Sequence, residues 1–268
     1  GMAAHIYDLV WSKQKSGDHT FNRMKGVVNY FGKSTLLKEV TNYKLEEYAL
    51  YLQNDGNSPA TINRKGAIIC KILNYAHRHG VISVKPMWTK QREPISRREW
   101  FTKEQEKKII TALSRYDFDL LDFFVVLIDT GMRRGELMSL SWDMVDLEGK
   151  TITLNNPEMI KNGIARSLPM TSRVHEIMER RITECPQNPF VHLSVYWENK
   201  VKKFKCIAGM NIPRMFHTCR HTFCSRLIQK GASLSEVKEL AGHKDLRTTL
   251  GYSHLATSNL TKAISLLE

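Results

Sequence analysis

The sequence predicts a mainly α-helical protein with a small antiparallel β-sheet, divided into an N-terminal helical domain and a longer α+β domain. Three observations support this prediction. Apolar residues recur at helical spacing in the first part of the chain, residues 84–99 break that pattern with prolines among mixed charges, and a strand–turn–strand pattern interrupts an otherwise helical second part. We therefore expect one domain over residues 1–90, a linker over 91–100 and a second domain over 101–268.

The helices expected in the first domain are marked by apolar stripes and by end signals. Residues 20–31 and 45–52 carry apolar side chains three and four positions apart. The third helix is the best marked, because Ser58 can cap its N-terminus, Pro59 suits its first position and Gly80 can end it. Its apolar face consists of Ile62, Ile69, Ile72, Leu73 and Ala76.

The charge of the chain favours a polyanionic partner. Its 40 Lys and Arg residues against 27 Asp and Glu leave a net charge of +13, and each phosphate neutralised in a nucleic acid releases counterions. Side chains on the other faces of the third helix are available to a DNA backbone, or else form an ordinary solvated surface. These side chains are Asn63, Arg64, Lys65 and Lys71.

The cysteine and hydropathy patterns argue against several classes of protein. The five cysteines are scattered without a C-x-x-C pair, so neither a disulfide framework nor a cysteine-rich zinc site is expected. No apolar run approaches the roughly 20 residues that a membrane span needs, and the start carries no signal-peptide pattern. We expect a cytoplasmic protein with no membrane partner.

The second domain is expected to begin with a capping box formed by Thr102 and Gln105. An apolar helical stretch follows over residues 120–128. Two strands, over 150–154 and 166–170, are then expected to pair as a hairpin, and the chain is mostly helical again from residue 218 onward.

The first motif with chemical potential is TGMRRGEL, between two expected helices. Gly131 ends the first helix, and Glu136 lies near the N-terminus of the second, where a carboxylate is favoured. Arg133 falls at the junction, from which a guanidinium can be aimed into a cleft; Arg134 is the residue most easily confused with it. The alternative is an ordinary surface arginine in a helix turn.

The second motif is Lys161-Asn162-Gly163, in the expected hairpin turn. A lysine delivered over a cleft can donate a proton to a departing oxygen. A lysine in a β-turn usually has no such role, so the surface interpretation remains open.

The third motif is HTCRHT. On a helix, His217 and Arg220 lie three residues apart and can both donate hydrogen bonds to one anion. Two alternatives remain: His217 and His221 can ligate a metal, although no third ligand is apparent, or His217 caps the helix and Arg220 is a surface charge.

The fourth motif joins GHKD to GY. Gly242 looks like a helix end followed by His243, and Tyr252 follows in a polar stretch where it need not belong to a core. A tyrosine in such a place more often packs than reacts.

Together these groups are what metal-free transesterification at a phosphodiester requires. A phenol has a reference pKa of about 10, so a positive site or a neighbouring base must activate it. Fixed cations stabilise the charge that develops on the phosphate oxygens, and losing one such donor typically costs about 3 kcal/mol.

The order of TGMRRGEL, KNG before a strand, HTCRHT, GHKD and GY closely resembles the tyrosine recombinases, phage integrases in particular, over essentially the whole chain. The resemblance implies a SAM-like helical core-type DNA-binding domain, a linker, and a catalytic domain. It implies that Arg133 and Arg220 clamp the scissile phosphate and that His243 completes the hydrogen-bond shell of that phosphate. Glu136 matches an acidic position that supports the first arginine.

The resemblance also assigns the groups that move protons and attack. Tyr252 would attack to leave a 3′-phosphotyrosine, Lys161 would protonate the departing 5′ oxygen, and His217 would be an acid/base partner. The phosphotyrosine retains the energy of the broken bond, so neither ATP nor a metal is expected. The chain has no P-loop motif and no carboxylate cluster for two-metal chemistry.

The implied partners are double-stranded DNA, a homo-tetramer on two duplexes that is weakly associated or monomeric without DNA, and accessory bending or directionality proteins. The implied element is a phage or another mobile element in a bacterial nucleoid. A terminal amphipathic helix is expected to dock on a neighbouring protomer, or alternatively on its own domain. Its apolar residues are Leu255, Leu260, Ala263, Ile264 and Leu267.

Two alternative functions remain open. One is a catalytically silent DNA-binding regulator with the same fold, which the intact motifs argue against, and another is a relaxing topoisomerase with the same chemistry. Many phage integrases also carry an additional N-terminal domain that binds arm sites, and nothing in the sequence corresponds to it. Either such a domain has been removed, or the protein is a shorter, Xer-like recombinase.

Overall fold

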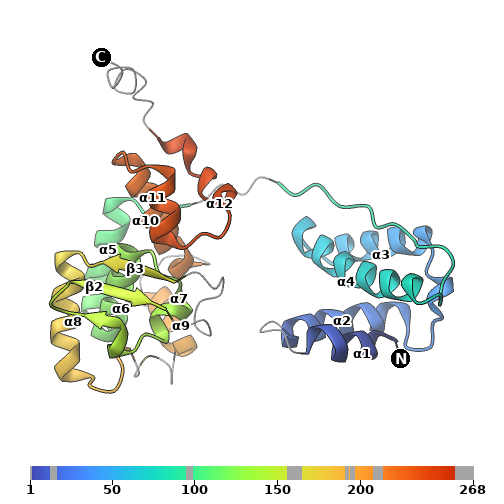
Figure 1. The fold of residues 1–268 in the computed structure, drawn as a ribbon, viewed down its shortest axis with the longest axis horizontal. Coiled ribbons are helices and arrows are strands. Elements are labelled where there is room, and N and C mark those ends of the chain that lie inside the picture. Colours follow the sequence, from blue (N-terminus) through green and yellow to red (C-terminus); the bar gives the residue numbers. More distant parts are fainter. Residues whose placement is uncertain are drawn as a thin grey trace, which may run out of the picture. The chain divides into compact units, whose positions relative to one another are not determined.

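The computed structural model describes residues 2–12, 17–94, 99–155, 165–190, 193, 197–207 and 214–256. The chain divides into two compact units, Gly1–Ser96 and Arg97–Glu268. It is mostly helical with a small antiparallel sheet, which confirms the fold class predicted from the sequence (Figure 1). Among the described residues, no helix combines the length and the apolar character that crossing a membrane would need.

The N-terminal unit is a set of helices around one apolar core (Figure 1). Its elements are α1 (Met2–Ile6), the π-helix η1 (Tyr7–Trp11), α2 (Gly17–Phe31), the 3-10 helix η2 (Leu37–Glu39), α3 (Asn42–Asn54) and α4 (Pro59–Arg78). The end signals of α4 are confirmed: the Ser58 side chain accepts a hydrogen bond from the backbone N–H of Thr61, and Gly80 has a positive φ of 69°. All five residues of its predicted apolar face are buried.

A strap of irregular backbone, residues 87–93, packs on the N-terminal unit after α4 ends. The backbone N–H of Met87 donates to Asn42 Oδ1 at 2.8 Å. Asn63 accepts from the Gln91 N–H and donates to the Gln91 carbonyl, both at 2.8 Å, and also donates to Glu93 Oε1. Part of the segment expected to be a linker is therefore fixed to α4.

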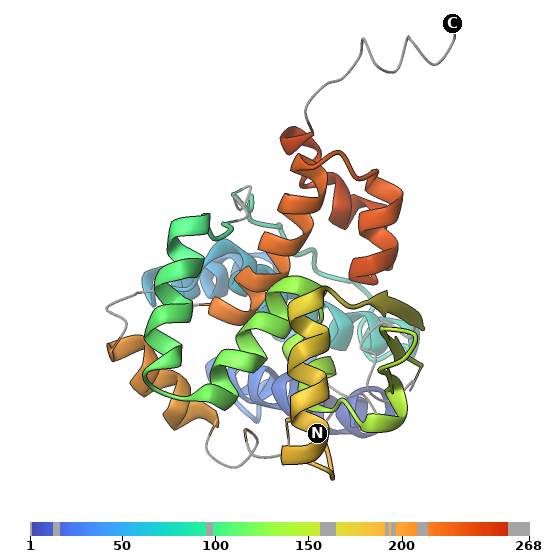
Figure 2. The same ribbon diagram turned by 90° about the vertical axis from the view of Figure 1, so that its left-hand side faces the viewer.

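The C-terminal unit is built on α6, which contacts α5, α7, α8 and α10. Figure 2 shows α10, in orange to red, extending from this helical body to α11 and α12. The helices of the unit are α5 (Lys103–Ser114), α6 (Phe118–Thr130), α7 (Arg134–Met138), η3 (Trp142–Met144), α8 (Ser172–Glu184), α9 (Trp197–Ile207), α10 (Met215–Gln229), α11 (Leu234–Ala241), α12 (Leu246–Leu250) and η5 (Ser253–Leu255). The capping box predicted for α5 is present.

The sheet joins β1 (Val145–Asp146), β2 (Thr151–Leu154) and β3 (Arg166–Pro169) in antiparallel order. β2 and β3 pair from Thr151↔Pro169 to Leu154↔Arg166, as the predicted hairpin requires. Both strands alternate between buried and less buried residues, and this alternation places Arg166 on the same buried face of β3 as Leu168. The hairpin turn lies outside the described residues.

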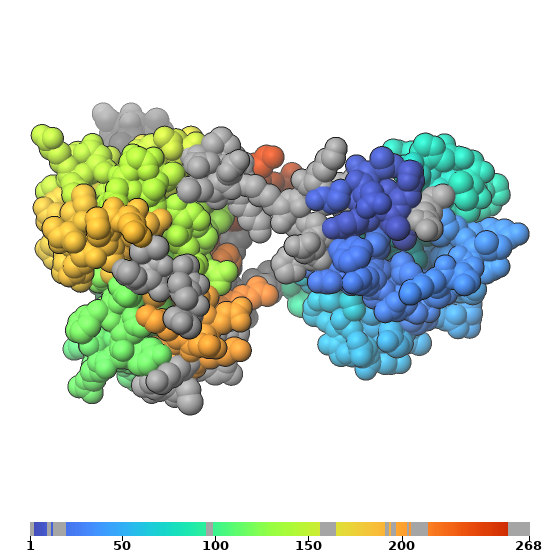
Figure 3. All heavy atoms as spheres, turned by 90° about the horizontal axis from the view of Figure 1, so that it is seen from below, coloured from blue at the N-terminus to red at the C-terminus, as the bar shows by residue number. Residues whose placement is uncertain are grey.

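Helix α9 is fixed against the turn between α5 and α6, and Figure 3 shows its atoms in orange beside those of α5 in green. Lys200 Nζ pairs with Asp117 Oδ2 at 2.7 Å, and the rings of Tyr116 and Phe204 lie 6.4 Å apart. At the start of α9, the Trp197 ring packs between Phe123 and Phe216. This packing places the beginning of α9 next to the beginning of α10.

We predict that Gly66→Ala destabilises the N-terminal unit, because a Cβ at residue 66 would lie 2.1 Å from Trp88 Cε2. Overpacking of this kind costs about 1–3 kcal/mol, and it should push Trp88 and the strap away from α4. Circular dichroism of the full chain during heating should show a lower unfolding midpoint.

The matched control is Gly26→Ala in α2, where a Cβ would meet no atom within 4 Å. Replacing a helical glycine by alanine there should stabilise the chain by about 0.5–1 kcal/mol. Equal shifts for the two variants would contradict the packing of Trp88 on Gly66.

Candidate active site

Arg133 is held at the junction of α6 and α7. Helix α6 ends at Gly131, whose φ of 64° is left-handed, and Arg133 is the N-cap residue of α7. Its backbone N–H donates to Glu136 Oε2 at 2.8 Å, and its Nη1 donates to Glu136 Oε1 at 2.7 Å. Nη2 reaches the carbonyl of Gly242 at 3.2 Å, across 109 residues of sequence. The guanidinium thus joins the start of α7 to the end of α11.

A second guanidinium, that of Arg166, approaches the same carboxylate from β3. Its Nη2 donates to Glu136 Oε2 at 2.6 Å, and its Nε donates to the Leu240 carbonyl at 3.1 Å. The side chains of Arg166 and Glu136 are 3 % and 1 % exposed, so this ion pair is shielded from solvent. Glu136 is therefore shared between Arg133 and Arg166.

The shared carboxylate is ionised despite its burial. Burial alone would raise the pKa of Glu136, but hydrogen bonds and charge from Arg166, together with the hydrogen bonds from Arg133, hold that pKa below its ordinary value. Glu136 is thus a buried negative charge at neutral pH, placed between two guanidinium groups.

Arg220 of α10 brings a third guanidinium into this region. It is 3 % exposed, and its Nη1 donates to the Gly131 carbonyl at 2.8 Å. Its Nη2 is buried and has no hydrogen-bond partner among the described residues. Burial, and then the nearby positive charge of Arg133, lower the pKa of Arg220 to about 10. Arg220 thus stays charged at neutral pH but is incompletely neutralised, which suits a site that awaits an anion.

His243 lies buried directly after α11. The helix ends at Gly242, whose φ is 62°, and His243 Nδ1 lies 2.9 Å from the hydroxyl of Thr249 in α12. The Gly242 carbonyl accepts a hydrogen bond from the Arg133 guanidinium. His243 is the next residue in the chain, so the same helix end places both near Arg133.

Tyr252 packs in a core, which is the environment that the sequence left open beside a reactive one. It is 1 % exposed and packs with Cys224, Ile228, Val237 and Ala241, because α10 and α11 close over it. Its hydroxyl lies 2.5 Å from His221 Nδ1. The tyrosine is therefore buried among apolar side chains with its oxygen on a histidine of α10.

His217 does not share the buried position of Arg220. It is exposed near the start of α10 and faces His221, with the two rings 4.4 Å apart in an edge-to-face arrangement. His221 thus stands between His217 and Tyr252. Within the described ranges, no three His, Cys, Asp or Glu side chains gather in a way that could hold a metal ion.

Of the other residues considered from the sequence, Lys161 and the terminal helix cannot be placed, whereas Arg134 can. Lys161 lies outside the described residues, as does the expected terminal helix beyond Leu255. Arg134 points elsewhere than Arg133, with its guanidinium 5.6 Å from the centre of the Trp197 ring. Of the two neighbouring arginines, only Arg133 contacts Glu136 and the Gly242 carbonyl in the described part of the chain.

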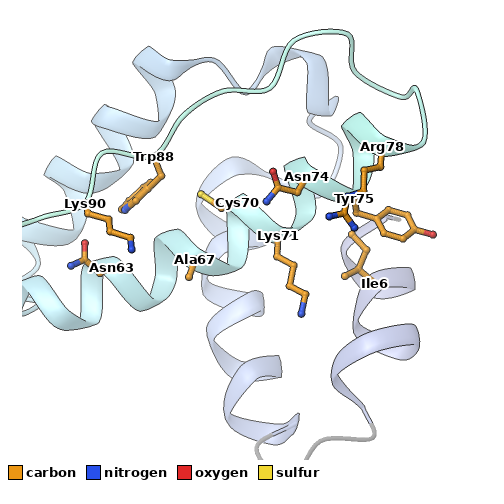
Figure 4. A pocket seen from close by; sticks show the side chains of 10 residues that line it. All are labelled: Ile6, Asn63, Ala67, Cys70, Lys71, Asn74, Tyr75, Arg78, Trp88 and Lys90. Carbon is orange, nitrogen blue, oxygen red and sulfur yellow. The ribbon is translucent and has the colours of Figure 1, made fainter. Parts of the chain in front are cut away.

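The four residues suggested for DNA contact lie on α4, and two of them, Asn63 and Lys71, line a groove of about 520 Å³ (Figure 4). Lys71 is exposed and lines this groove with Asn74 and Arg78 of α4 and Lys90 of the strap. Arg64 is also exposed, and Lys65 donates to Asn57 Oδ1 at 3.2 Å. Asn63 also borders the groove, but both polar atoms of its amide are used in fixing the strap.

Two residues of the site were missed as functional candidates. The alternation in β3 could have shown that Arg166 shares the inward face with Leu168, and a buried arginine requires a carboxylate. His221 was considered only as a metal ligand, because its contact with Tyr252 depends on how α10 and the segment after α12 come together.

Comparison with known proteins identifies related families and relatives over both units. The phage integrase family model matches residues 99–259, and the phage integrase SAM-like domain model matches residues 4–92. A protein named tyrosine recombinase from Pseudothermotoga lettingae is 26 % identical over 278 positions, covering 97 % of this chain and 96 % of the relative. A tyrosine recombinase XerC-like protein from Caldanaerobacter subterraneus subsp. tengcongensis is 25 % identical, covering 93 % of this chain and 75 % of the relative.

Solved structures share the fold at low sequence identity. The Tn1549 transposon integrase in complex with a circular intermediate DNA aligns with a TM-score of 0.77 and 19 % identity, covering 100 % of this chain and 98 % of that one. A lambda integrase dimer bound to a COC′ core site aligns with a TM-score of 0.74 and 16 % identity, covering 92 % of this chain and 95 % of that one.

We predict that Glu136→Gln destabilises the chain in a pH-dependent way. The lowered pKa of Glu136 means that its contribution to stability is present above the unfolded value of 4.5 and is lost as the pH falls through the folded value. Leaving the buried guanidinium of Arg166 and the partly buried one of Arg133 without their carboxylate should cost about 3–5 kcal/mol at pH 7. Urea unfolding at a series of pH values should show this difference shrink below pH 4.5.

Glu184→Gln serves as the control, because Glu184 pairs with the exposed Arg180 at 3.2 Å on the surface of α8. It should change stability by less than about 1 kcal/mol. A loss in Glu136→Gln that stays constant across the pH range would contradict the ionised, shared carboxylate.

Proposed function

The chain belongs to the phage integrase family and is a tyrosine-type site-specific DNA recombinase, and we propose that it cleaves and rejoins DNA through a covalent 3′-phosphotyrosine at Tyr252. The assignment of site residues rests on the geometry of the C-terminal unit. The observation that carries it is the pair formed by the partly buried Arg133 and the buried Arg220, whose charge exceeds what the neighbouring carboxylate neutralises.

This pair is suited to bind the scissile phosphate. Arg220 keeps one buried N–H₂ group without a partner among the described residues, and a non-bridging phosphate oxygen would supply an acceptor for it. Arg133 lies close enough to lower the pKa of Arg220, so one anion can approach both groups. As negative charge builds up on the phosphoryl oxygens during attack, these fixed cations lower the barrier. His243 is proposed to complete the hydrogen-bond shell of the phosphate.

The proposed reaction exchanges one phosphodiester for another. The Tyr252 oxygen attacks phosphorus, the bond from phosphorus to the 5′ oxygen breaks, and the 3′ end stays attached to the protein. The phenolic proton passes to a neighbouring base, for which His221 at 2.5 Å and His217 beside it are the candidates. We propose that Lys161 gives a proton to the departing 5′ oxygen. The reverse steps rejoin the strand, so no external energy source is needed.

Tyr252 must change its surroundings before it can react. A hydroxyl on a side chain that is 1 % exposed cannot meet a DNA phosphate. We propose that DNA binding shifts the segment around η5 and turns the hydroxyl towards the phosphate, and that its proton passes to His221 or His217 during this movement.

The N-terminal unit is proposed to hold the DNA duplex through its basic groove. Lys71, Arg78 and Lys90 project around this groove, and Arg64 is exposed on the same helix (Figure 4). These cations would contact phosphates and supply affinity without reading sequence. We assign Asn63 to the strap instead, because its amide already makes three hydrogen bonds.

The partners of the reaction follow from this proposal. The Tn1549 and lambda integrase structures contain DNA, which supports double-stranded DNA as the partner of this chain. We propose that four subunits assemble on two duplexes, with weak association or monomers in the absence of DNA. The expected setting is a bacterial or phage-encoded system associated with the nucleoid, in which accessory bending or directionality proteins take part and a phage or other mobile element is integrated or excised.

We predict that Tyr252→Phe abolishes covalent attachment to DNA, because the substitution removes the attacking oxygen. The substrate is a set of duplex pools with a randomised centre, each nicked at a different position. Where the nick lies next to the cleavage point, the short released strand diffuses away and traps the adduct. Denaturing gels should show an adduct for the wild type alone, and sequencing the attached DNA would identify the site. The Kd for duplexes selected from these pools should change less than about twofold.

Tyr48→Phe in the N-terminal unit provides the control, since Tyr48 is also 1 % exposed. It removes the same atom from another buried tyrosine and should leave adduct formation unchanged. An adduct that persists in Tyr252→Phe would exclude Tyr252 as the nucleophile.

A further inference from the structure

We infer that Arg166 is a positioning residue for the cleavage reaction, which keeps the charge of Arg133 available to the phosphate by taking up part of the charge of Glu136. This inference rests on the proposed function and concerns how the phosphate site is held. Arg166 belongs to β3, the strand that follows the hairpin turn, and lies outside the motifs from which the site was predicted.

The contacts of Arg166 leave it little capacity to bind a phosphate itself. Nε donates to the Leu240 carbonyl, Nη2 to Glu136 Oε2, and Nη1 lies 3.5 Å from Glu136 Oε1. Arg220, in contrast, retains a buried group without a partner among the described residues. Arg166 therefore acts on the phosphate through its neighbours.

Glu136 is the link between Arg166 and Arg133. Its Oε2 accepts from the backbone N–H of Arg133 and from Nη2 of Arg166, while its Oε1 accepts from Nη1 of Arg133. Without Arg166, the full charge of Glu136 would act on Arg133 alone. The guanidinium of Arg133 would then be neutralised by its own carboxylate and would attract a phosphate less strongly.

Arg166 also joins three segments that carry proposed site residues. It connects β3 to α7 through Glu136 and to the end of α11 through Leu240, two residues before Gly242. A Cβ at residue 242 would lie 2.6 Å from Arg166 Nη1, so Gly242 allows the end of α11 to lie directly on this guanidinium. The Gly242 carbonyl in turn receives Arg133, and His243 follows it.

We predict that Arg166→Met slows single-turnover cleavage by about 100-fold while the Kd for DNA changes less than about threefold. The measurement uses a nicked duplex selected from the randomised pools described above. Arg166→Lys, which keeps the positive charge beside Glu136, should restore at least part of the lost rate. Arg173→Met is the control, because Arg173 pairs with Glu106 and Asp129 at distances of 2.8 and 2.5 Å elsewhere in the same unit. It should leave the cleavage rate unchanged.

A double-mutant cycle separates positioning from a merely structural role. If Arg166 acts through Arg133, then Arg166→Met in an Arg133→Lys background should slow cleavage less than about threefold further. If the rate losses of the two single variants multiply in the double variant, the inference is wrong. It is also wrong if Arg166→Met cleaves at the wild-type rate. If Arg166→Met does not fold, the uncharged polar variant Arg166→Gln takes its place in the cycle. A wild type that forms no adduct at Tyr252 would instead refute the proposed function itself.

Discussion

The site depends on one electrostatic constraint: three guanidinium groups, those of Arg133, Arg166 and Arg220, lie around the single shared carboxylate of Glu136. Burying this excess charge opposes folding. Because the pKa of Arg220 is lowered to about 10, the folded chain holds that proton less tightly than the unfolded chain, and the charged group costs stability at every pH below that value. A bound phosphate would neutralise this charge and remove the cost. The charge that destabilises the free protein therefore strengthens the binding of the phosphate.

The backbone of the C-terminal unit is shaped to bring these charges together. Two left-handed glycines, Gly131 and Gly242, end α6 and α11 and offer their carbonyls to Arg220 and Arg133. A side chain is excluded at both positions, because a Cβ would collide with Phe223 at the first and with Arg166 at the second. Each arginine therefore receives one acceptor from a helix end and keeps its remaining donors for ion pairs or for the phosphate.

Much of this arrangement could be predicted from the sequence, because it depends on local signals. Capping residues mark helix ends, as at Ser58, Gly131 and Gly242. Alternation of apolar residues predicts the pairing of β2 with β3. Both signals come from residues that are neighbours in the sequence. The fold class was predicted from such patterns, whereas the family was indicated by the resemblance of the ordered motifs to those of the tyrosine recombinases. The burial of Tyr252 and its contact with His221 could not be predicted, because they depend on the packing of α10 against α11, which no local pattern specifies. The strap escaped prediction for the same reason, since its charges and the flanking Pro86 and Pro94 are typical of a linker, while Trp88 fits over Gly66.

The excess positive charge at Arg133 and Arg220 can be tested without knowing the DNA target. Inorganic phosphate should bind between these two guanidiniums and stabilise the folded chain, since a ligand that binds only the native state raises its stability. The measurement is the melting midpoint in phosphate compared with chloride at equal ionic strength, for the wild type and for Arg220→Met. A rise in the wild type that is lost in the variant is the expected result. An equal rise in both proteins would show that phosphate acts elsewhere and would contradict the account of the site.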